Sequence, residues 1–331
     1  MTASAVVPPR VSAEKGRNFA KLAIRLGAFV GFALIAIYFA VTARGFVTSY
    51  NLTNIVEQST ILGVLAYGMT LVFAGTGTDV QRGGIDLSIA ANAGLCAAVY
   101  AVLMRAGYGG MVAVPCALVT GMIVGALNGF AVVGLKIMPL LATLAVMNIT
   151  EGLELTLTEN TVVSVSSPMI DTLAFGRLLG ISTMSWIFVV VSIVLIWIAH
   201  YSRTGLRLYA VGGHAEAARA AGIRNGTYVY GAYIGAGLLA GLTSILIVAR
   251  LSSSTPGTGQ MLLPVLAAAL LGTVFSRRLI PTIGGTLLAA LFIGTLANGF
   301  QLLGISSYWV SGVQGALILV VVAATSFAKN S

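Results

Sequence analysis

Three acidic side chains in apolar surroundings are the residues of this chain best placed to do chemistry. Asp86 follows two glycines in Gly83-Gly-Ile-Asp-Leu-Ser88, and Glu151 and Glu154 stand three residues apart on one face of an expected helix. A carboxylate at membrane depth is expensive to bury and is usually functional. The spacing of Glu151 and Glu154 could serve a proton relay, although their place near the end of an apolar run also fits two interfacial carboxylates.

The segment around Asp86 supports two interpretations. Gly83 and Gly84 free the backbone, and Asp86 or Ser88 can then cap the amides at the start of a new helix. One interpretation is a loop and a helix cap at the cytoplasmic surface. The other is a broken helix whose end lines a transport path, as discontinuous helices do in transporters.

A second polar feature is a short helix expected between two apolar runs, in a loop at about 202–227. One face of it carries almost bare methyl groups, and a pair of opposite charges, Glu216 and Arg219, can form on its flank. A membrane-surface helix would show bulky Leu, Phe or Trp there, so this face fits a groove in another protein. The face consists of His214, Ala217, Ala218 and Ala221, with Gly212 and Gly213 expected to permit a sharp entry and Gly222 a left-handed end.

The amino-acid composition indicates the kind of protein that must position these residues. The chain has 331 residues, of which 58% are hydrophobic and 8% are charged. An ordinary soluble domain is about a quarter charged, so this is an integral membrane protein. We expect one transmembrane domain over 22–331, preceded by a polar cytoplasmic tail over 1–21.

Ten apolar runs are of a length suited to crossing a bilayer as helices, which predicts an all-α fold. The third and eighth are short. The runs are Leu22–Ala43, Leu52–Ala74, Leu87–Met104, Met111–Leu135, Met138–Thr158, Met184–Tyr201, Tyr228–Ala249, Met261–Phe275, Thr282–Leu303 and Tyr308–Phe327.

The basic residues predict the orientation, because Lys and Arg gather in cytoplasmic loops. With ten spans and both termini in the cytoplasm, only four of the 18 basic residues lie outside: Arg44, Arg105, Arg177 and Arg250. The net charge of +9 is therefore a signal of topology. No basic stripe interleaved with aromatic residues indicates nucleic-acid binding.

The chain also repeats itself. Asn128-Gly-Phe-Ala-Val-Val-Gly-Leu135 recurs as Asn298-Gly-Phe-Gln-Leu-Leu-Gly-Ile305, each time at the end of a long run. In the expected topology the two copies cross the membrane in opposite directions, which predicts an inverted repeat relating spans two to five to spans seven to ten. A chance match of apolar residues is the alternative. With a real repeat, Asn128 and Asn298 join Gly83, Gly84, Asp86 and Ser88 as candidates for the broken helix or the translocation path.

The stretch Arg203–Ile223, together with Gly-Gly-Ile-Asp-Leu-Ser at 83–88, resembles the permease subunits of ribose-type sugar ABC importers. The likeness runs from about Asn51 to Ala324 and includes Met138-Pro-Leu-Leu-Ala-Thr-Leu144 and the ending Asn298-Gly-Phe300. The resemblance implies a non-enzymatic translocation subunit of the bacterial inner membrane that moves a pentose, hexose or polyol by alternating access. It also implies that residues 212–222 form a coupling helix seated in a cleft of the ATPase.

The resemblance further implies a set of partners. These are a cytoplasmic ATPase chain that binds ATP and Mg, a periplasmic sugar-binding protein, and a second permease copy or a paralogue, all within membrane lipid. The chain lacks the phosphate-loop pattern G-x-x-x-x-G-K-[ST], so no cofactor is expected on it. Arg44, Arg105, Arg177 and Arg250 are candidates for gripping acidic residues of the binding protein, since rim charges steer docking.

Two segments depart from the family pattern, residues 76–82 and residues 273–281, and both are expected near the cytoplasmic side. A different class of protein is also compatible with the sequence, namely a secondary transporter of a small polar solute driven by an ion gradient. In that case Asp86, Glu151 and Glu154 would be the coupling acids. It accounts for the repeat but leaves the alanine-faced helix unexplained. An intramembrane enzyme is the least favoured class, because no nucleophile with a base and no metal cluster is evident.

Overall fold

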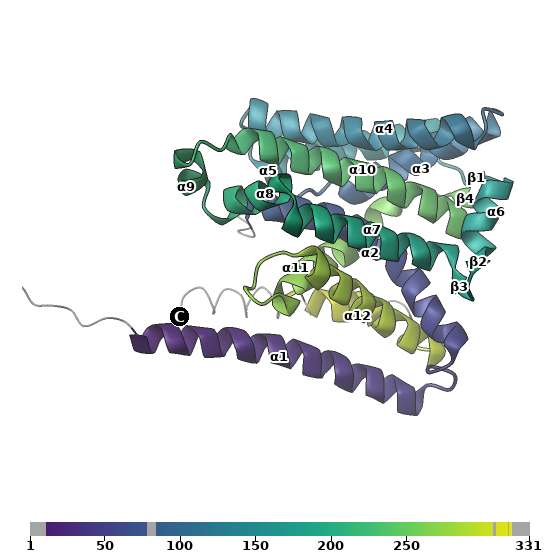
Figure 1. The fold of residues 1–331 in the computed structure, drawn as a ribbon. Coiled ribbons are helices and arrows are strands. Elements are labelled where there is room, and N and C mark those ends of the chain that lie inside the picture. Colours follow the sequence, from purple (N-terminus) through teal and green to yellow (C-terminus); the bar gives the residue numbers. More distant parts are fainter. Residues whose placement is uncertain (1–10, 78–83, 307–308, 317, 320–331) are drawn as a thin grey trace, which may run out of the picture.

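The protein is a bundle of long apolar helices, seen here in a computed structural model (Figure 1). The structure describes residues 11–77, 84–306, 309–316 and 318–319. In chain order the elements are α1 (Val11–Thr42), α2 (Ser49–Thr76), α3 (Ile89–Arg105), α4 (Gly110–Gly129), the π-helical η1 (Phe130–Gly134), α5 (Pro139–Thr158), β1 (Val163–Ser164), α6 (Pro168–Phe175), β2 (Arg177–Leu178), β3 (Ile181–Ser182), α7 (Thr183–Tyr201), α8 (Arg203–Gly213), α9 (Ala215–Ala220), α10 (Asn225–Leu251), β4 (Ser253–Ser254), the 3-10 helix η2 (Thr258–Met261), α11 (Leu262–Phe275) and α12 (Ile283–Leu302).

In the described part of the chain, eight helical segments are long and apolar enough to cross a membrane. The shorter apolar helix α3, of 17 residues, makes a ninth crossing possible. These segments fall within or overlap the first nine predicted runs, so the all-α membrane fold is confirmed. Most of the tenth run, Tyr308–Phe327, lies outside the described residues. Helix α1 starts at Val11, so the second half of the predicted polar tail is helical.

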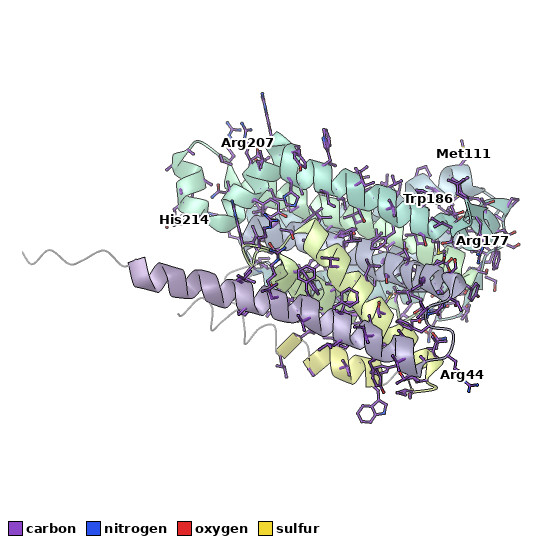
Figure 2. The ribbon with its side chains drawn as sticks, turned by 60° about the horizontal axis from the view of Figure 1, so that its bottom comes forward. Arg44, Met111, Arg177, Trp186, Arg207 and His214 are labelled. Atoms are coloured by element: carbon purple, nitrogen blue, oxygen red, sulfur yellow. The ribbon has the colours of Figure 1, made fainter. Side chains whose placement is uncertain are left out.

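The two ends of the bundle differ in structure. Helices α8 and α9 lie at one end, together with the start of α1, while the short strand pairs β1–β4 and β2–β3 lie at the other (Figure 1). Arg207 and His214 mark the first end, and Arg44 and Arg177 mark the second (Figure 2). Following the charge prediction, we call the first the cytoplasmic end and the second the outer end.

Helix packing follows the predicted inverted repeat. The repeat makes α2 the counterpart of α10, α3 that of α11 and α4 that of α12. The contact of α4 with α10 in the structure then has its counterpart in the contact of α12 with α2. The same correspondence relates the contact of α3 with α10 to that of α11 with α2, and the contact of α3 with α4 to that of α11 with α12. Each of these six helices thus packs against the other half. The partner of α5 lies mostly outside the described residues.

Both copies of the repeated motif contain a hydrogen bond of the same span near the helix end. The amide of Leu135 donates to the Phe130 carbonyl at 3.0 Å, and the amide of Ile305 donates to the Phe300 carbonyl at 2.9 Å. Each bond spans five residues. The first belongs to the π-helix η1, and the second closes the end of α12 at Gly304, which has φ +69°. Asn128 and Asn298, which begin the two copies, are both buried. A buried asparagine and a bond of the same span at equal positions favour the repeat over a chance match, although the two helix ends differ in backbone conformation.

Helices α4 and α10 meet through glycines. A methyl group added to Gly121 would collide with the Gly237 carbonyl, and one added to Gly237 would collide with the Gly121 carbonyl. A methyl group on Gly125 would strike the Tyr233 carbonyl, and one on Gly241 would lie 2.9 Å from the Leu118 Cα. Small residues allow such backbone contact in lipid, where apolar side chains alone give helices little reason to associate. This contact holds the first half of the repeat to the second.

We expect Gly237→Ala to destabilise the protein by about 1–3 kcal/mol, since the two backbones must separate to admit a methyl group. The matched control is Gly231→Ala on the same helix, where nothing lies within 4 Å of the added carbon. The unfolding temperature of each variant is measured in detergent as the temperature at which the monodisperse fraction is lost. Equal unfolding temperatures for the two variants would show that the α4–α10 contact is not under this constraint.

Candidate functional site

Helix α8 is fixed to the bundle by a small apolar cluster. Leu208 of α8 packs with Ala74 near the end of α2 and Ala232 near the start of α10. Gly212 lies so close to α2 that an added methyl group would collide with the Ala74 carbonyl. The Arg207 Nη1 also donates to the Tyr228 hydroxyl of α10 at 3.0 Å. The segment therefore contacts one long helix from each half of the repeat.

The expected single helix is two helices that meet at His214. The His214 Nδ1 accepts a hydrogen bond from the Ala217 amide at 3.4 Å, so His214 caps α9 and is not part of a helical face. Gly212 and Gly213 end α8 in helical geometry. The role predicted for Gly212, a sharp entry, is wrong; its lack of a side chain is used for close packing.

The predicted end of the helix is confirmed. Gly222 has φ +79°, the left-handed region that glycine adopts without strain, and the Ile223 amide donates back to the Ala218 carbonyl at 3.0 Å. The Asn225 Nδ2, at the start of α10, donates to the Ala215 carbonyl at 2.7 Å. Helix α9 is thus fastened directly to α10.

The methyl face of α9 is only partly as predicted. Ala217 and Ala221 are exposed, as are His214, Glu216 and Arg219. Ala218 is 4% exposed, because α9 contacts α10 and one face must turn inward. Glu216 and Arg219 form no ion pair in the structure. Two alanine methyl groups flanked by exposed charges remain available to a partner protein.

A further contact joins α8 to the preceding helix. His200 at the end of α7 stacks on Tyr209 of α8, with ring centroids 5.5 Å apart and planes 15° apart. Burial raises the pKa of Tyr209 above its usual range, so its hydroxyl stays neutral. The stack closes the corner at which the chain leaves the bundle.

Asp86, Ser88 and Asn128 form a buried network at the start of α3. The Asp86 Oδ1 accepts from the Ser88 amide at 3.0 Å and from the Ser88 hydroxyl at 2.7 Å. The Asn128 Nδ2 donates to the Ser88 hydroxyl at 2.7 Å and to the Asp86 Oδ1 at 3.3 Å. Ser88 makes no side-chain cap on α3, so the predicted capping role is wrong for Ser88. Its hydroxyl links Asp86 to α4.

This network lies inside the bundle, which favours the broken-helix interpretation over a surface loop. Thr143 of α5 holds the segment on one side, donating to the Ile85 carbonyl at 3.0 Å and accepting from the Leu87 amide at 3.1 Å. On another side, a methyl group on Gly84 would lie 2.8 Å from the hydroxyl of Tyr233. Tyr233 is eight residues into α10, about 12 Å along its axis. Irregular backbone at that depth is tolerated because protein surrounds it.

The other predicted path residues separate from this network. Gly83 lies outside the described residues. Asn298 is near the outer end of α12, where its amide and that of Asn51 on α2 exchange two hydrogen bonds of 2.9 Å. The five predicted residues that the structure describes therefore divide between two places, the network at the start of α3 and the Asn51–Asn298 pair that joins α2 to α12.

Glu151 and Glu154 lie near the outer end of α5, as predicted, but only Glu151 is partly exposed. Glu154 is 2% exposed, against Gly94 of α3, and its Oε1 has no hydrogen-bond partner among the described residues. Glu151 faces Gly259 in η2, which precedes the short helix α11. Glu154 also contacts the backbone of Gly257, which directly precedes η2, so the two carboxylates remain neighbours.

All four predicted rim arginines are exposed, and Arg44 and Arg177 lie at the outer end (Figure 2). Arg44 follows α1 and Arg105 ends α3. Arg177 lies over the Tyr50 ring at 5.9 Å, and the Arg250 Nη1 lies 3.9 Å from the Glu57 Oε2. Arg177 and Arg250 also line a common cavity, which Arg44 and Arg105 do not.

Comparison with known proteins gives the family. Residues 51–322 match the family described as branched-chain amino acid transport system / permease component. The ribose import permease protein RbsC of Escherichia coli (strain K12) is 36% identical over 295 residues, which cover 87% of this chain and 89% of that protein. The chain is a member of the ABC-importer permease family, of the ribose type.

Two other relatives agree with this assignment. The permease is 33% identical to the ribose import permease protein RbsC of Bacillus subtilis (strain 168), over 93% of this chain and 95% of that protein. It is 26% identical to the L-arabinose ABC transporter permease protein AraH of Azospirillum brasilense, over 92% and 88%. A multi-pass protein of the bacterial inner membrane follows from the family and the apolar helices.

Sequence reasoning missed several residues of the permease that position these sites. Leu208, Asn225 and Thr143 each fix a candidate element to the bundle. Asn225 carried a usable signal, since Asn favours the first residues of a helix. Leu208 and Thr143 carried none, because an apolar residue in an apolar chain and a threonine inside a span are unremarkable.

We expect Asn128→Ala to lower the stability of the permease by about 1–3 kcal/mol, because the buried Ser88 hydroxyl and Asp86 carboxylate lose a donor. Asn148→Ala is the control, since Asn148 is exposed and bonds only within its own helix, to the Leu144 carbonyl at 2.8 Å. Denaturation in detergent compares the two. A loss of unfolding free energy no greater than that of Asn148→Ala would show that the Asn128 hydrogen bonds do not stabilise the permease.

Proposed function

We propose that this permease is the translocation subunit of an ATP-driven importer that carries a sugar, a pentose, hexose or related polyol, into the cytoplasm. Its relatives are named as a ribose import permease and an L-arabinose ABC transporter permease, and this supports the class of cargo. ATP and Mg are bound by a separate ATPase chain, and a periplasmic binding protein delivers the sugar. A second permease copy or a paralogue completes the pathway.

The observation that carries this proposal is the exposed α8–α9 segment and its attachment to the bundle. A helix with two free methyl groups offers little area to lipid but fits a cleft in a protein. Its contacts with α2 and α10 mean that a displaced α9 moves both halves of the repeat. Rocking one half against the other is how transporters of this architecture alternate access.

On the outer end, Arg44 and Arg105 are the cations best placed to meet a binding protein. Both are exposed, and neither lines the cavity that holds Arg177 and Arg250. Protruding cations increase the rate at which a partner with acidic residues associates. This reduces the predicted docking set from four arginines to two.

ATP-dependent uptake tests the proposal against its alternative. The permease, its candidate ATPase and its binding protein are reconstituted in proteoliposomes, and radiolabelled ribose, arabinose and glucose are offered at a clamped membrane potential. Uptake that requires ATP supports the importer. Uptake that continues without ATP and follows an ion gradient would make the permease a secondary transporter, with Asp86, Glu151 and Glu154 as the acids to neutralise.

We expect the double variant Ala217→Arg, Ala221→Arg to abolish ATP-driven uptake, at least tenfold below native, because two long cations replace the methyl groups that enter the ATPase. The control is Thr204→Arg, an exposed residue of α8 at the same end. Capture of the ATPase by immobilised permease is measured beside uptake. Full uptake and full capture in the double variant would exclude α9 from the ATPase contact.

A further inference from the structure

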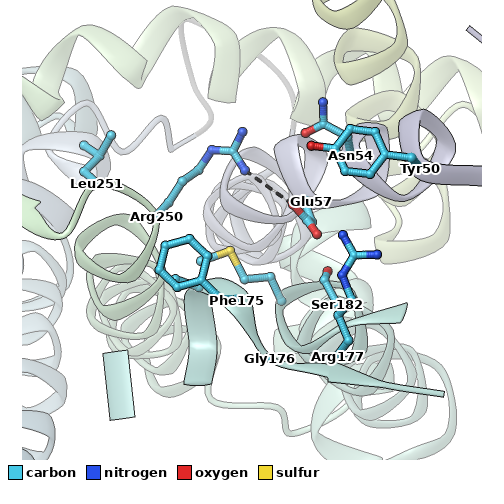
Figure 3. A pocket seen from close by; sticks show the side chains of 11 residues that line it. Tyr50, Asn54, Glu57, Phe175, Gly176, Arg177, Ser182, Arg250 and Leu251 are labelled. Atoms are coloured by element: carbon cyan, nitrogen blue, oxygen red, sulfur yellow. Dashed lines mark ion pairs between the residues drawn. The ribbon is translucent and has the colours of Figure 1, made fainter. Parts of the chain in front are cut away.

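A cavity of about 480 Å³ opens at the outer end, between the start of α2, the end of α6 and the end of α10 (Figure 3). Its lining residues are Tyr50, Asn54, Glu57, Ala174, Phe175, Gly176, Arg177, Ser182, Met184, Arg250 and Leu251. Small-molecule sites typically occupy about 300–1,000 Å³. The cavity is therefore large enough for a small solute.

One wall is a polar stripe on α2. Tyr50, Asn54 and Glu57 are spaced by four and three residues, so they share one face of the helix and all line the cavity. Together they present an aromatic ring, an amide and a carboxylate. An amide both donates and accepts hydrogen bonds, whereas a carboxylate only accepts.

The facing walls supply donors. The guanidinium of Arg250 points across the cavity at Glu57, and that of Arg177 enters beside Ser182 (Figure 3). The Arg250 Nη1 and the Glu57 Oε2 are 3.9 Å apart, too far for a hydrogen bond. Their side chains are 33% and 21% exposed, so both remain accessible. The acceptor and the donors thus keep free hydrogen-bonding capacity toward the space between them.

Phe175 adds aromatic surface to these polar walls, while the Tyr50 ring lies under the Arg177 guanidinium. A ring face carries partial negative charge, which attracts the partly positive C–H groups of a sugar ring. A sugar hydroxyl can donate to Glu57 and accept from an arginine at the same time. One water occupies about 30 Å³ in the liquid, so the cavity has room for a solute of about a dozen non-hydrogen atoms.

We infer that this cavity is a reception site on the permease itself, which takes a neutral polyhydroxylated solute between Glu57, Asn54 and the two arginines as the solute enters from the outer side. The inference rests on the proposed function and gives its cargo a place on this chain. It also explains why Arg250 is a poor docking residue, since its side chain faces Glu57 inside a cavity.

Direct binding tests the inference without transport. The native permease in lipid nanodiscs, with no partner protein, is titrated with D-ribose, D-glucose and xylitol, and saturation-transfer NMR reports binding. We expect saturable binding of at least one of these, weakened at least tenfold by Glu57→Gln and by Asn54→Ala. Glu159→Gln, an exposed carboxylate at the end of α5, is the control and should bind as the native protein does.

Each outcome of that titration decides something. No binding of any of the three probes to the folded native permease overturns the inference, while the ATP-dependent uptake assay independently tests the proposed function. Binding that Glu57→Gln and Asn54→Ala leave unchanged places the solute elsewhere and also overturns it. Either variant suffices if the other does not fold.

A second measurement separates solute reception from protein docking. The affinity of the loaded binding protein for the permease is compared between native and Glu57→Gln, together with the amount of sugar imported per ATP hydrolysed. We expect unchanged affinity and at least a tenfold loss of sugar per ATP. A parallel tenfold loss of affinity, with normal import at saturating binding protein, would make Glu57 a docking residue for a basic side chain of the binding protein and reject the inference.

Discussion

Backbone contact between α4 and α10 is the constraint on which the rest of this permease depends. In lipid, apolar side chains gain little by leaving the solvent, so close approach of helices must supply the attraction. Gly121, Gly125 and Gly237 provide that approach where the first half of the repeat meets the second. The equivalent pair, α2 and α12, also uses a glycine, since Gly294 makes room for the Ser59 side chain of α2. Two interlocked halves, each completed by helices of the other, result from these contacts.

Much of this arrangement could be predicted from the sequence because lipid imposes simple rules. Apolar length located nine helical segments in the described residues, and the repeated Asn-Gly-Phe motif indicated which helices correspond. The left-handed end at Gly222 followed from glycine's freedom at positive φ. The composition of the cytoplasmic segment indicated an exposed helix that serves a partner, and its place at one end of the bundle agrees with this.

What could not be predicted depends on contacts between distant segments. The inward turn of Ala218 depends on how α9 lies against α10, and a helical wheel of α9 alone does not contain that information. Glu154 looked interfacial from its position in α5, but Gly94 of another helix makes room for its carboxylate. Glu57 was one polar residue among several at membrane depth. Its significance came from Arg250, which is nearly two hundred residues away in the chain and 3.9 Å away in space.

The bond from the Asn225 side chain to the Ala215 carbonyl fixes α9 to α10, so the α8–α9 segment can transmit a displacement to the bundle. A flexible loop would absorb a push by stretching before its ends moved. Here the chain is clamped at one side by Leu208 between α2 and α10, and at the other by Asn225 at the first residue of α10. A displacement of a few ångströms at α9 therefore reaches α2 and α10 at once and without slack. Energy released outside the bilayer can be delivered to the bundle as motion, with no chemical group passing between the two chains.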